Sequence, residues 1–346
     1  MNNSNGYKKI LIVRLDRIGD VLLSTPAIKA ARDTYPDSHI AVMVRPYAKD
    51  IVEGNPYLNE VILYDRSGRE KNLSGNLKFI DHLRRKNFDI ALILHPTKRT
   101  HIITFLAGIP VRVGYDKKWG NLLTKKIPNV KQFGLKHEID YTLDILKYAG
   151  IETNDRALYM PLKETSEKAI SEVFEKNGIT KDSLIITLNP GASCASKRWR
   201  PENFAKVGDL LARERGAKII IISDLKDKPF ADKTTALMKV APLNLAGMTS
   251  VADIASVLKR SRLFISNDSG PVHIACAVGT PVIAIFGRSD KGLSPERWGP
   301  TGKRDIILHK YVGCAVCLAH NCKIGFKCLE AITPEEVLAA AKRMLG

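Results

Sequence analysis

The chain lacks any apolar run of the ~20 residues that a membrane-spanning helix requires. It also lacks the layout of a secretory signal, because residues 1–6 are polar and the apolar run that follows covers only Ile10–Val13. These two absences predict a protein of the cytoplasm.

Acidic residues are scarce relative to basic ones, with 36 Asp and Glu against 54 Lys and Arg, for a net charge of +18. Such an excess favours a polyanionic partner, which leaves nucleic acid, a phosphorylated small molecule and an anionic membrane surface open, beside a merely solvated basic surface. Aromatic residues make up only 7% and form no stripe, which speaks against a protein that stacks on bases.

A chain of 346 residues is too long for one typical core, so we expect two domains, 1–165 and 166–346. In both halves short β-branched runs alternate with amphipathic helices, which is typical of an α/β fold with a doubly wound parallel sheet. Strands are predicted at 8–13, 40–44, 61–64, 90–94, 111–113, 184–188, 217–222, 263–265 and 282–286. Helices are predicted at 20–34, 77–85, 102–107, 204–215, 251–259, 271–278 and 334–344, the last opened by a capping box of Thr333 and Glu336.

Glycine is scarce at the first strand-to-helix corner, Arg14–Asp20, which has one glycine instead of the three of a dinucleotide fingerprint. Ligands in open α/β sheets bind at the carboxyl ends of strands, so polar residues at this corner are candidates for a site. Asp20 is interpreted either as a helix cap or as a general base. Its neighbours Arg14, Asp16 and Arg17 would tune it or bind phosphate.

The second corner, residues 189–199, lacks the Walker pattern of a P-loop ATPase. Small residues there allow a close approach of the backbone to a ligand, Ser193 and Ser196 offer hydroxyl donors, and Lys197 and Arg198 offer positive charge. This mixture suits a diphosphate, with an ordinary basic loop as the alternative.

The third corner, residues 266–273, reads SNDSGPVH between a strand and a helix. Asp268 and Ser269 are candidate helix caps, and the backbone N–H of Gly270 is a candidate phosphate donor. Asp268 would otherwise face sugar hydroxyls or pair with Lys197. His273 lies one turn into the helix, where a hydrogen-bonded core histidine is the alternative to a binding role.

Two further acids, Asp224 and Asp227, follow a strand of the second half. Acidic residues at such positions bind ribose hydroxyls in nucleotide-binding folds, and solvated loop acids are the alternative.

These corners, in this order, resemble glycosyltransferase family nine, the ADP-heptose:lipopolysaccharide heptosyltransferases, and the second heptosyltransferase branch more than the first. The resemblance covers roughly Lys8 to Leu345. The matching stretches are Ile10–Arg14 with Gly19-Asp20-Val21 and Thr25-Pro26-Ala27, Asn189-Pro190-Gly191-Ala192 with Lys197-Arg198-Trp199, Asn244-Leu245-Ala246-Gly247, and Asn267-Asp268-Ser269-Gly270 with His273.

The resemblance implies a GT-B architecture of two Rossmann-like domains facing across a cleft, with the acceptor on the N-terminal side and the nucleotide-sugar on the C-terminal side. The last helix is expected to pack back on the N-terminal domain. The resemblance further implies an inverting, metal-independent transfer with Asp20 as catalytic base. The implied donor-binding residues are Ser193, Lys197, Asp268, Ser269, Gly270 and His273, with Asp227 standing where the family has a ribose-binding Glu.

The implied substrates are ADP-heptose and the phosphorylated lipopolysaccharide inner core, and no further cofactor is required. Acceptor-binding candidates are Arg14, Arg17, Lys98 and Arg99. We expect a monomer in peripheral contact with the anionic inner face of the inner membrane, without nucleic acid as a partner. Asp227 is shorter than the Glu of the family. An enzyme of the same fold that uses another nucleotide-sugar or acceptor is therefore an alternative. A non-catalytic polyanion-binding protein, for example on nucleic acid, is the alternative of another class.

Four of the six cysteines lie within residues 314–328, as Cys314-x2-Cys317-x4-Cys322-x5-Cys328. They have the ligand number of a tetrahedral zinc site, and an iron–sulfur cluster or free, oxidation-sensitive thiols are the alternatives. Cys194, beside the predicted phosphate loop, is interpreted as a packing residue because no His or Asp is spaced to activate it.

Overall fold

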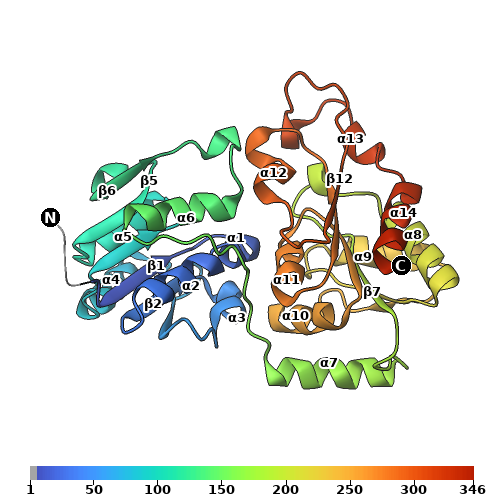
Figure 1. Ribbon diagram of the computed structural model, residues 1–346, viewed down its shortest axis with the longest axis horizontal. Coiled ribbons are helices and arrows are strands. Elements are labelled where there is room, and N and C mark those ends of the chain that lie inside the picture. The colour runs from blue at the N-terminus through green and yellow to red at the C-terminus, as the bar shows by residue number, and fades with distance from the viewer. Residues whose placement is uncertain (1–5) are drawn as a thin grey trace. The chain divides into compact units, whose positions relative to one another are not determined.

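The computed structural model describes residues 6–346 and divides the chain into two units (Figure 1). Residues 1–5, on which part of the argument against a secretory signal rested, lie outside the described residues. One unit comprises the chain up to Gln132 together with Lys136–Pro161, and the other comprises Phe133–Leu135 with Leu162–Gly346.

The first unit is built on a parallel six-stranded sheet in the order β3-β2-β1-β4-β5-β6. Its strands are β1 Lys9–Val13, β2 His39–Val44, β3 Glu60–Leu63, β4 Ile90–Ile93, β5 Val111–Asp116 and β6 Lys125–Pro128. In the central strand, Ile10 pairs with Ile40 on one side and Ile90 on the other, and Ile10–Val13 are fully buried. Helices on both faces explain why these strands are continuously apolar. Strand β6 was not predicted, because two lysines and Pro128 suit only a sheet edge.

Helices cover both faces of this sheet, with α2 against α6 and α4 against α5. The predicted single helix at 20–34 is wrong: α1 ends at Leu22 and α2 begins at Thr25, with Pro26 in its first turn, where the missing N–H of proline costs no hydrogen bond. The helical segments are α1 Ile18–Leu22, α2 Thr25–Thr34, η1 Pro46–Ala48, α3 Lys49–Val52, α4 Leu73–Arg85, α5 Lys98–Leu106, η2 Gly120–Leu122, η3 Lys131–Phe133 and α6 Glu138–Tyr148.

The second unit carries another parallel six-stranded sheet, in the order β12-β11-β10-β7-β8-β9. Its strands are β7 Ile185–Asn189, β8 Lys218–Ile221, β9 Leu243–Asn244, β10 Leu263–Asn267, β11 Val282–Phe286 and β12 Ile306–His309. The sequence did not predict β9 and β12, which lie at the two edges, where strands are short and only partly buried.

Helices α8, α9 and α14 pack together, and α7, α10 and α11 form a second group (Figure 1). The capping box of Thr333 and Glu336 is confirmed, and Val337, Ala340 and Ala341 of α14 lie in the core of this unit. The last helix therefore belongs to the second unit. The helical segments are α7 Glu164–Lys176, η4 Ala195–Lys197, α8 Pro201–Arg215, α9 Lys228–Leu237, α10 Val251–Arg260, α11 Gly270–Val278, η5 Lys291–Leu293, α12 Pro295–Trp298, η6 Ala319–Asn321, α13 Lys327–Glu330 and α14 Pro334–Leu345.

The two sheets have the same topology. Numbered along the chain within its own unit, each has the strand order 3-2-1-4-5-6 of a Rossmann fold. The predicted α/β architecture with two Rossmann-like units is confirmed. The strand order reverses between β1 and β4 in the first unit and between β7 and β10 in the second, and ligands of such sheets bind at the carboxyl ends of the strands there. Among the described residues, no helix is long and apolar enough to cross a membrane.

Candidate functional site

The carboxyl end of β1 is organised around the buried side chain of Arg14. Its Nε lies 2.8 Å from an oxygen of Asp16, and its Nη2 lies 2.8 Å from Oδ1 of Asp20 and 3.2 Å from Oε1 of Glu138. Its Nη1 donates to the carbonyl oxygen of Leu94 at the end of β4. Burial disfavours the charge of Arg14, but the three carboxylates outweigh burial and raise the pKa of its guanidinium. Arg14 is thus engaged inside the unit, which fits a residue that positions Asp20 better than one that binds an acceptor phosphate.

Asp20 lies at the third position of α1, inside the helix, whereas the N-cap is Arg17. The interpretation of Asp20 as a helix cap is therefore wrong. Its carboxylate accepts a hydrogen bond from Arg14 at 2.8 Å, and its side chain keeps 15% of its surface exposed. Asp20 is therefore held in place and still accessible, as a base that must reach a substrate needs to be.

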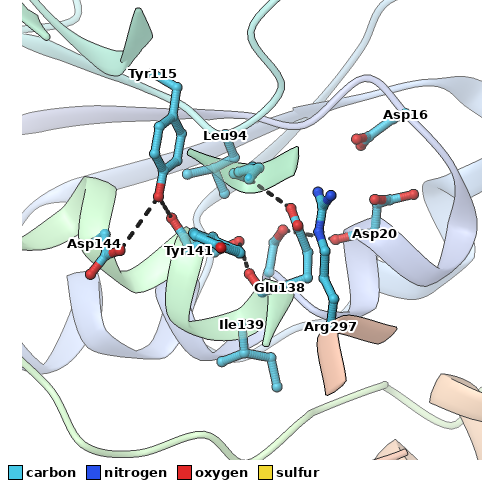
Figure 2. Close-up of polar contacts among 12 residues, drawn as sticks. Asp16, Asp20, Leu94, Tyr115, Glu138, Ile139, Tyr141, Asp144 and Arg297 are labelled. Carbon is cyan, nitrogen blue, oxygen red and sulfur yellow. Dashed lines mark hydrogen bonds and ion pairs between the residues drawn. The ribbon is translucent and has the colours of Figure 1, made fainter. Parts of the chain in front are cut away.

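Glu138, at the start of α6, is a member of this cluster that sequence reasoning missed. Figure 2 shows Asp20 and Glu138 on different helices at this end of the sheet. The Glu138 carboxylate is 2% exposed and accepts hydrogen bonds from Arg14 and from Nζ of Lys131 at 2.7 Å. The Lys131 ammonium lies 4.7 Å from the ring centre of Tyr115. The hydroxyl of Tyr115 donates to the Tyr141 carbonyl of α6 at 2.9 Å, which ties α6 to β5 (Figure 2). No helix was predicted here, so no signal marked Glu138.

One neighbour of this cluster, His95, favours its neutral form. His95 follows β4, and burial together with the charges of Arg14, Lys118 and Lys131 lowers its pKa to about 3. Within the cluster, burial raises the pKa of the Asp16 carboxyl, and the charge of Arg14 opposes that shift. The sequence offered one signal for His95, since it directly follows a predicted strand.

The other acceptor-binding candidates lie nearer the surface. Arg17 and Lys98 are exposed, and the Lys98 ammonium lies 5.6 Å from the ring centre of Trp119. Arg99 donates to the Tyr64 hydroxyl at 2.9 Å. Arg17 and Lys98 are therefore the cations of this set with the most access to a ligand.

In the second unit, Asp268 follows β10 and is 6% exposed. Its Oδ2 lies 2.9 Å from Nζ of Lys197, and it also accepts a hydrogen bond from Arg288. The predicted pairing of Asp268 with Lys197 is confirmed. Ser269 is the N-cap of α11, as predicted, but its side chain makes no capping hydrogen bond. Asp268 precedes the N-cap, so the prediction of Asp268 as a cap is wrong. Arg288, two residues beyond β11, was not predicted as part of the site; its φ of 29° is uncommon for a residue other than glycine.

The start of α11 lies beside β7 through hydrogen bonds of Asn189. Its Nδ2 donates to Ser266 Oγ at 3.1 Å and to Ser269 Oγ at 2.9 Å. Gly270 is the first residue of α11, so its amide belongs to the positive end of the helix dipole. His273 lies in the same helix and is buried.

The loop that carries Ser193 and Lys197 is fixed at both ends by Asn267. Asn267 Nδ2 donates to the Pro190 carbonyl at 2.9 Å, and its Oδ1 accepts from the Trp199 amide at 2.9 Å. Trp199 is fully buried. Between these anchors Ser193 is exposed and Lys197 is partly buried, so both side chains stand in a loop with a defined course.

Asp227 lies at the N-cap position of α9, beside Arg198. The Arg198 guanidinium lies 3.3 Å from the Asp227 carboxylate and stacks on the ring of Phe230 at 3.6 Å from its centre. Burial raises the pKa of Asp227, as does the nearby Asp224, whose carboxylate accepts the Asp227 amide at 2.8 Å. Asp227 is therefore already paired with Arg198 in this unit.

All four cysteines of the 314–328 run are free and line one pocket of about 440 Å³ together with Ser196 and Arg288. No group of three or more His, Cys, Asp or Glu side chains among residues 6–346 is arranged to hold a metal ion.

The chain thus consists of two Rossmann-like units. One holds a carboxylate at its switch point, and the other holds cations and a helix N-terminus there, an arrangement typical of α/β enzymes. The chain belongs to glycosyltransferase family 9 (heptosyltransferase), whose family model matches residues 76–327. It is therefore a glycosyltransferase, and the alternative of a non-catalytic polyanion-binding protein is wrong.

Relatives and solved structures match almost the whole chain. The chain is 26% identical to lipopolysaccharide heptosyltransferase 3 of Escherichia coli, covering 94% of this chain and 95% of the relative. It is 24% identical to lipopolysaccharide heptosyltransferase 2 of Escherichia coli, covering 97% and 98%. A family 9 glycosyltransferase from Veillonella parvula matches at a TM-score of 0.89 and 26% identity over 98% of both chains. The ADP-heptose heptosyltransferase II of Escherichia coli matches in fold at a TM-score of 0.79 and 21% identity, over 97% of this chain and 98% of that chain.

Proposed function

We propose that this enzyme transfers heptose from ADP-heptose to the phosphorylated inner core of lipopolysaccharide, with inversion and without a catalytic metal. Relatives named heptosyltransferases 2 and 3 support the substrate class, and the second branch is our proposed assignment. The observation that carries the mechanism is Asp20, a partly exposed carboxylate held by a buried arginine at the carboxyl end of the first sheet.

Asp20 is the proposed general base. An acceptor hydroxyl is a poor nucleophile at neutral pH, so its proton must be taken as it attacks. The hydroxyl oxygen bonds to the anomeric carbon from the face opposite the diphosphate, and the proton passes to Asp20. The bond from the anomeric carbon to ADP breaks, ADP departs with the electron pair, and the configuration inverts. Arg14 keeps Asp20 oriented, and Glu138 in turn holds Arg14.

Lys197 is the proposed partner of the diphosphate, whose negative charge grows as the sugar leaves. Lys197 pairs with Asp268, but Asp268 is also held by Arg288. Lys197 therefore turns toward a phosphate without leaving a buried carboxylate unpaired, which would be costly. The hydroxyls of Ser193 and Ser269 and the first amides of α11, from Gly270 onward, supply further donors.

The sugar, ribose and acceptor contacts are assigned by the same reasoning. Asp268 and His273 are proposed to lie near the sugar, and Asp227 near the ribose. Exposed cations such as Arg17 and Lys98 are proposed to meet the phosphorylated acceptor, which agrees with a net charge of +18. We further propose a monomer that works at the cytoplasmic face of the inner membrane.

A thermal-shift screen against ADP, UDP, GDP and dTDP tests the donor class. Ligand at 100 times its Kd stabilises a folded protein by about 2.7 kcal/mol, so selective binding is easily resolved. We expect that, among the four nucleotides, only ADP raises Tm clearly. We also expect release of ADP from ADP-heptose when a lipopolysaccharide core acceptor is present. A larger rise in Tm with another nucleotide would instead support the alternative of a different nucleotide-sugar donor, which Asp227, paired with Arg198, suggests.

A further inference from the structure

His95 lies just beyond the carboxyl end of β4, and the proposed mechanism does not use it. The residue before it, Leu94, donates its amide to the Val13 carbonyl at 3.0 Å and accepts a hydrogen bond from Nη1 of Arg14 at 2.9 Å. Leu94 and Asp20 lie at the same end of the sheet (Figure 2). The strand order reverses between β1 and β4, so His95 stands at the switch point of the first unit, where ligands of such sheets bind.

The two ring nitrogens of His95 have different surroundings. Nδ1 is buried, and among residues 6–346 no group makes a hydrogen bond with it. The residue as a whole keeps part of its surface exposed. Since Nδ1 is closed to solvent, Nε2 is the ring nitrogen that is left for a ligand.

A structural role does not account for this arrangement. A core histidine normally has hydrogen-bond partners, because a buried polar atom without one destabilises the folded state. Within the described part of the chain, Nδ1 of His95 has no such partner. An unsatisfied buried group of this kind is more typical of a residue that serves a site than of one that stabilises the fold.

The surroundings of His95 also determine which nitrogen carries the proton. Burial and nearby cations lower the pKa of His95 to about 3, so the ring is neutral at physiological pH and carries one N–H. The cations are Arg14, Lys118 and Lys131, and Glu138 is the acid that opposes them. A proton on Nδ1 would be a buried donor without an acceptor in a region of positive charge, which is costly. The proton therefore lies on Nε2, and the ring presents a neutral N–H donor at its accessible nitrogen.

The same features make His95 unsuited to act as a second base. A histidine that takes a proton in catalysis has a pKa near the working pH, and a partner at its other nitrogen orients the ring. The low pKa of His95 and its unpartnered Nδ1 fit neither condition. Proton transfer therefore stays with Asp20, and a binding role is left for His95.

We propose that His95 is an acceptor-binding residue, whose Nε2–H donates a hydrogen bond to an oxygen of the acceptor sugar while Asp20 takes the proton of the attacking hydroxyl. This role rests on the proposed function and adds an uncharged donor to the cations already assigned to the acceptor. A cation in place of His95 would compete with Arg14 for the Asp20 carboxylate, whereas a neutral N–H orients a hydroxyl without doing so. The nearby Lys118 is exposed and is suited to the charged groups of the acceptor.

Acceptor binding in the absence of any donor tests the proposal. Calorimetry with a deacylated lipopolysaccharide core compares the wild type with His95→Gln, His95→Asn and His95→Ala. The amide nitrogen of Gln lies about where Nε2 was, and that of Asn lies about where Nδ1 was. We expect the acceptor Kd to rise about 3- to 10-fold in the Asn and Ala variants, as for a lost hydrogen bond between uncharged groups, and less than about 2-fold in the Gln variant.

The pattern among the variants decides the outcome, and the exposed His82, changed to Gln, is the control. Equal Kd values for all proteins, or a Gln variant that binds as weakly as the Asn variant, would overturn the proposal. Because the three variants differ at one position only, a general loss of stability does not produce recovery in Gln alone.

Steady-state kinetics separates binding from proton transfer. We expect the acceptor KM to follow the Kd and the affinity for ADP to stay the same, because the hydrogen bond is made to the acceptor only. The pH profile of kcat should keep its shape in His95→Gln between about pH 5.5 and 8.5, and loss of its acidic limb would show that His95 is a base instead. A wild type that binds the acceptor through His95 but releases no ADP from ADP-heptose would support the role of His95 and contradict the proposed donor.

Discussion

The two units of this protein share one strand order and differ in the charge that they gather at the ends of their central strands. In the first unit, three carboxylates surround one buried arginine, Arg14. In the second, two cations surround one buried carboxylate, Asp268. The same topology thus places an acidic cluster in one unit and a basic cluster in the other.

This difference shows that the strand order determines where a site lies in such a fold, whereas the side chains determine its chemistry. A carboxylate that stays exposed beside a buried arginine suits proton transfer, and paired cations beside a helix N-terminus suit a diphosphate. Each cluster also contains one arginine that holds a carboxylate in place: Arg14 holds Asp20, and Arg288 holds Asp268.

The largest effect is expected for Asp20→Asn, which removes the base and keeps the shape. We expect the transfer rate kcat to fall about 10²–10⁴-fold while ADP affinity is unchanged, because the base acts only on the acceptor proton. Initial rates and ADP-induced thermal shifts measure the two quantities. The control is Asp81→Asn, a side chain on α4 that is 49% exposed and pairs with Arg85. A near-full rate in Asp20→Asn would show that the acidic cluster of the first unit is not catalytic.

The second effect concerns the stability of the first unit. Glu138→Gln removes one buried charge that faces Arg14 and Lys131, and we expect a loss of about 3 kcal/mol in the free energy of unfolding. The control, Glu60→Gln, breaks a partly exposed pair with Lys86 and should cost less than about 1 kcal/mol. Urea unfolding of both variants checks the prediction, and equal losses would refute the importance of the buried network.

The third effect tests the basic cluster of the second unit. We expect Lys197→Ala to weaken ADP binding by about 10- to 100-fold, since a hydrogen bond to a charged group is worth about 1.5–3 kcal/mol. Lys206→Ala on α8 is the control, because that lysine is exposed and pairs with Glu335 at the surface. Calorimetry with ADP gives both affinities. The same Kd for Lys197→Ala and the wild type would be incompatible with a phosphate role.

The fourth effect is a pH dependence located in the first unit, and it is the smallest near neutral pH. His95 has a folded pKa of about 3 against about 6.5 when unfolded, so the unfolded chain binds more protons between these values. The wild type should lose stability as pH falls below ~6.5, by at most about 1.4 kcal/mol per pH unit from this residue. His95→Gln lacks this loss, so its Tm relative to the wild type should rise as pH falls from 6.5 toward 4. A constant difference across that range would argue against a neutral His95. The exposed His82, changed to Gln, serves as the control.

Much of the fold was predictable because it depends on local patterns. Buried parallel strands such as β1 and β7 read as continuous β-branched runs, and the capping box of Thr333 and Glu336 marks α14. Edge strands β6, β9 and β12 were not predicted, because short and partly exposed strands have no continuous β-branched run. The break between α1 and α2 was missed because an amphipathic pattern continues across it.

The candidate site was predictable only where its residues follow predicted strands. Asp20, Lys197 and Asp268 stand at such corners. Glu138 does not, and its partner Arg14 lies 124 positions away in the sequence. Arg288 was missed for the same reason, because nothing near it in the sequence marks its pairing with Asp268.

By itself the sequence determined the two α/β halves, the corners that bear polar residues and the resemblance to family 9. Local periodicity in the sequence is enough to predict which strands are buried and where they end. Only the tertiary structure decided what each charge does. It made Arg14 the partner of three acids, and it made Asp268 the partner of Lys197 and Arg288 instead of a helix cap. The reason is physical: the state of a buried charge depends on the partners that folding brings within about 4 Å, and these come from distant parts of the chain.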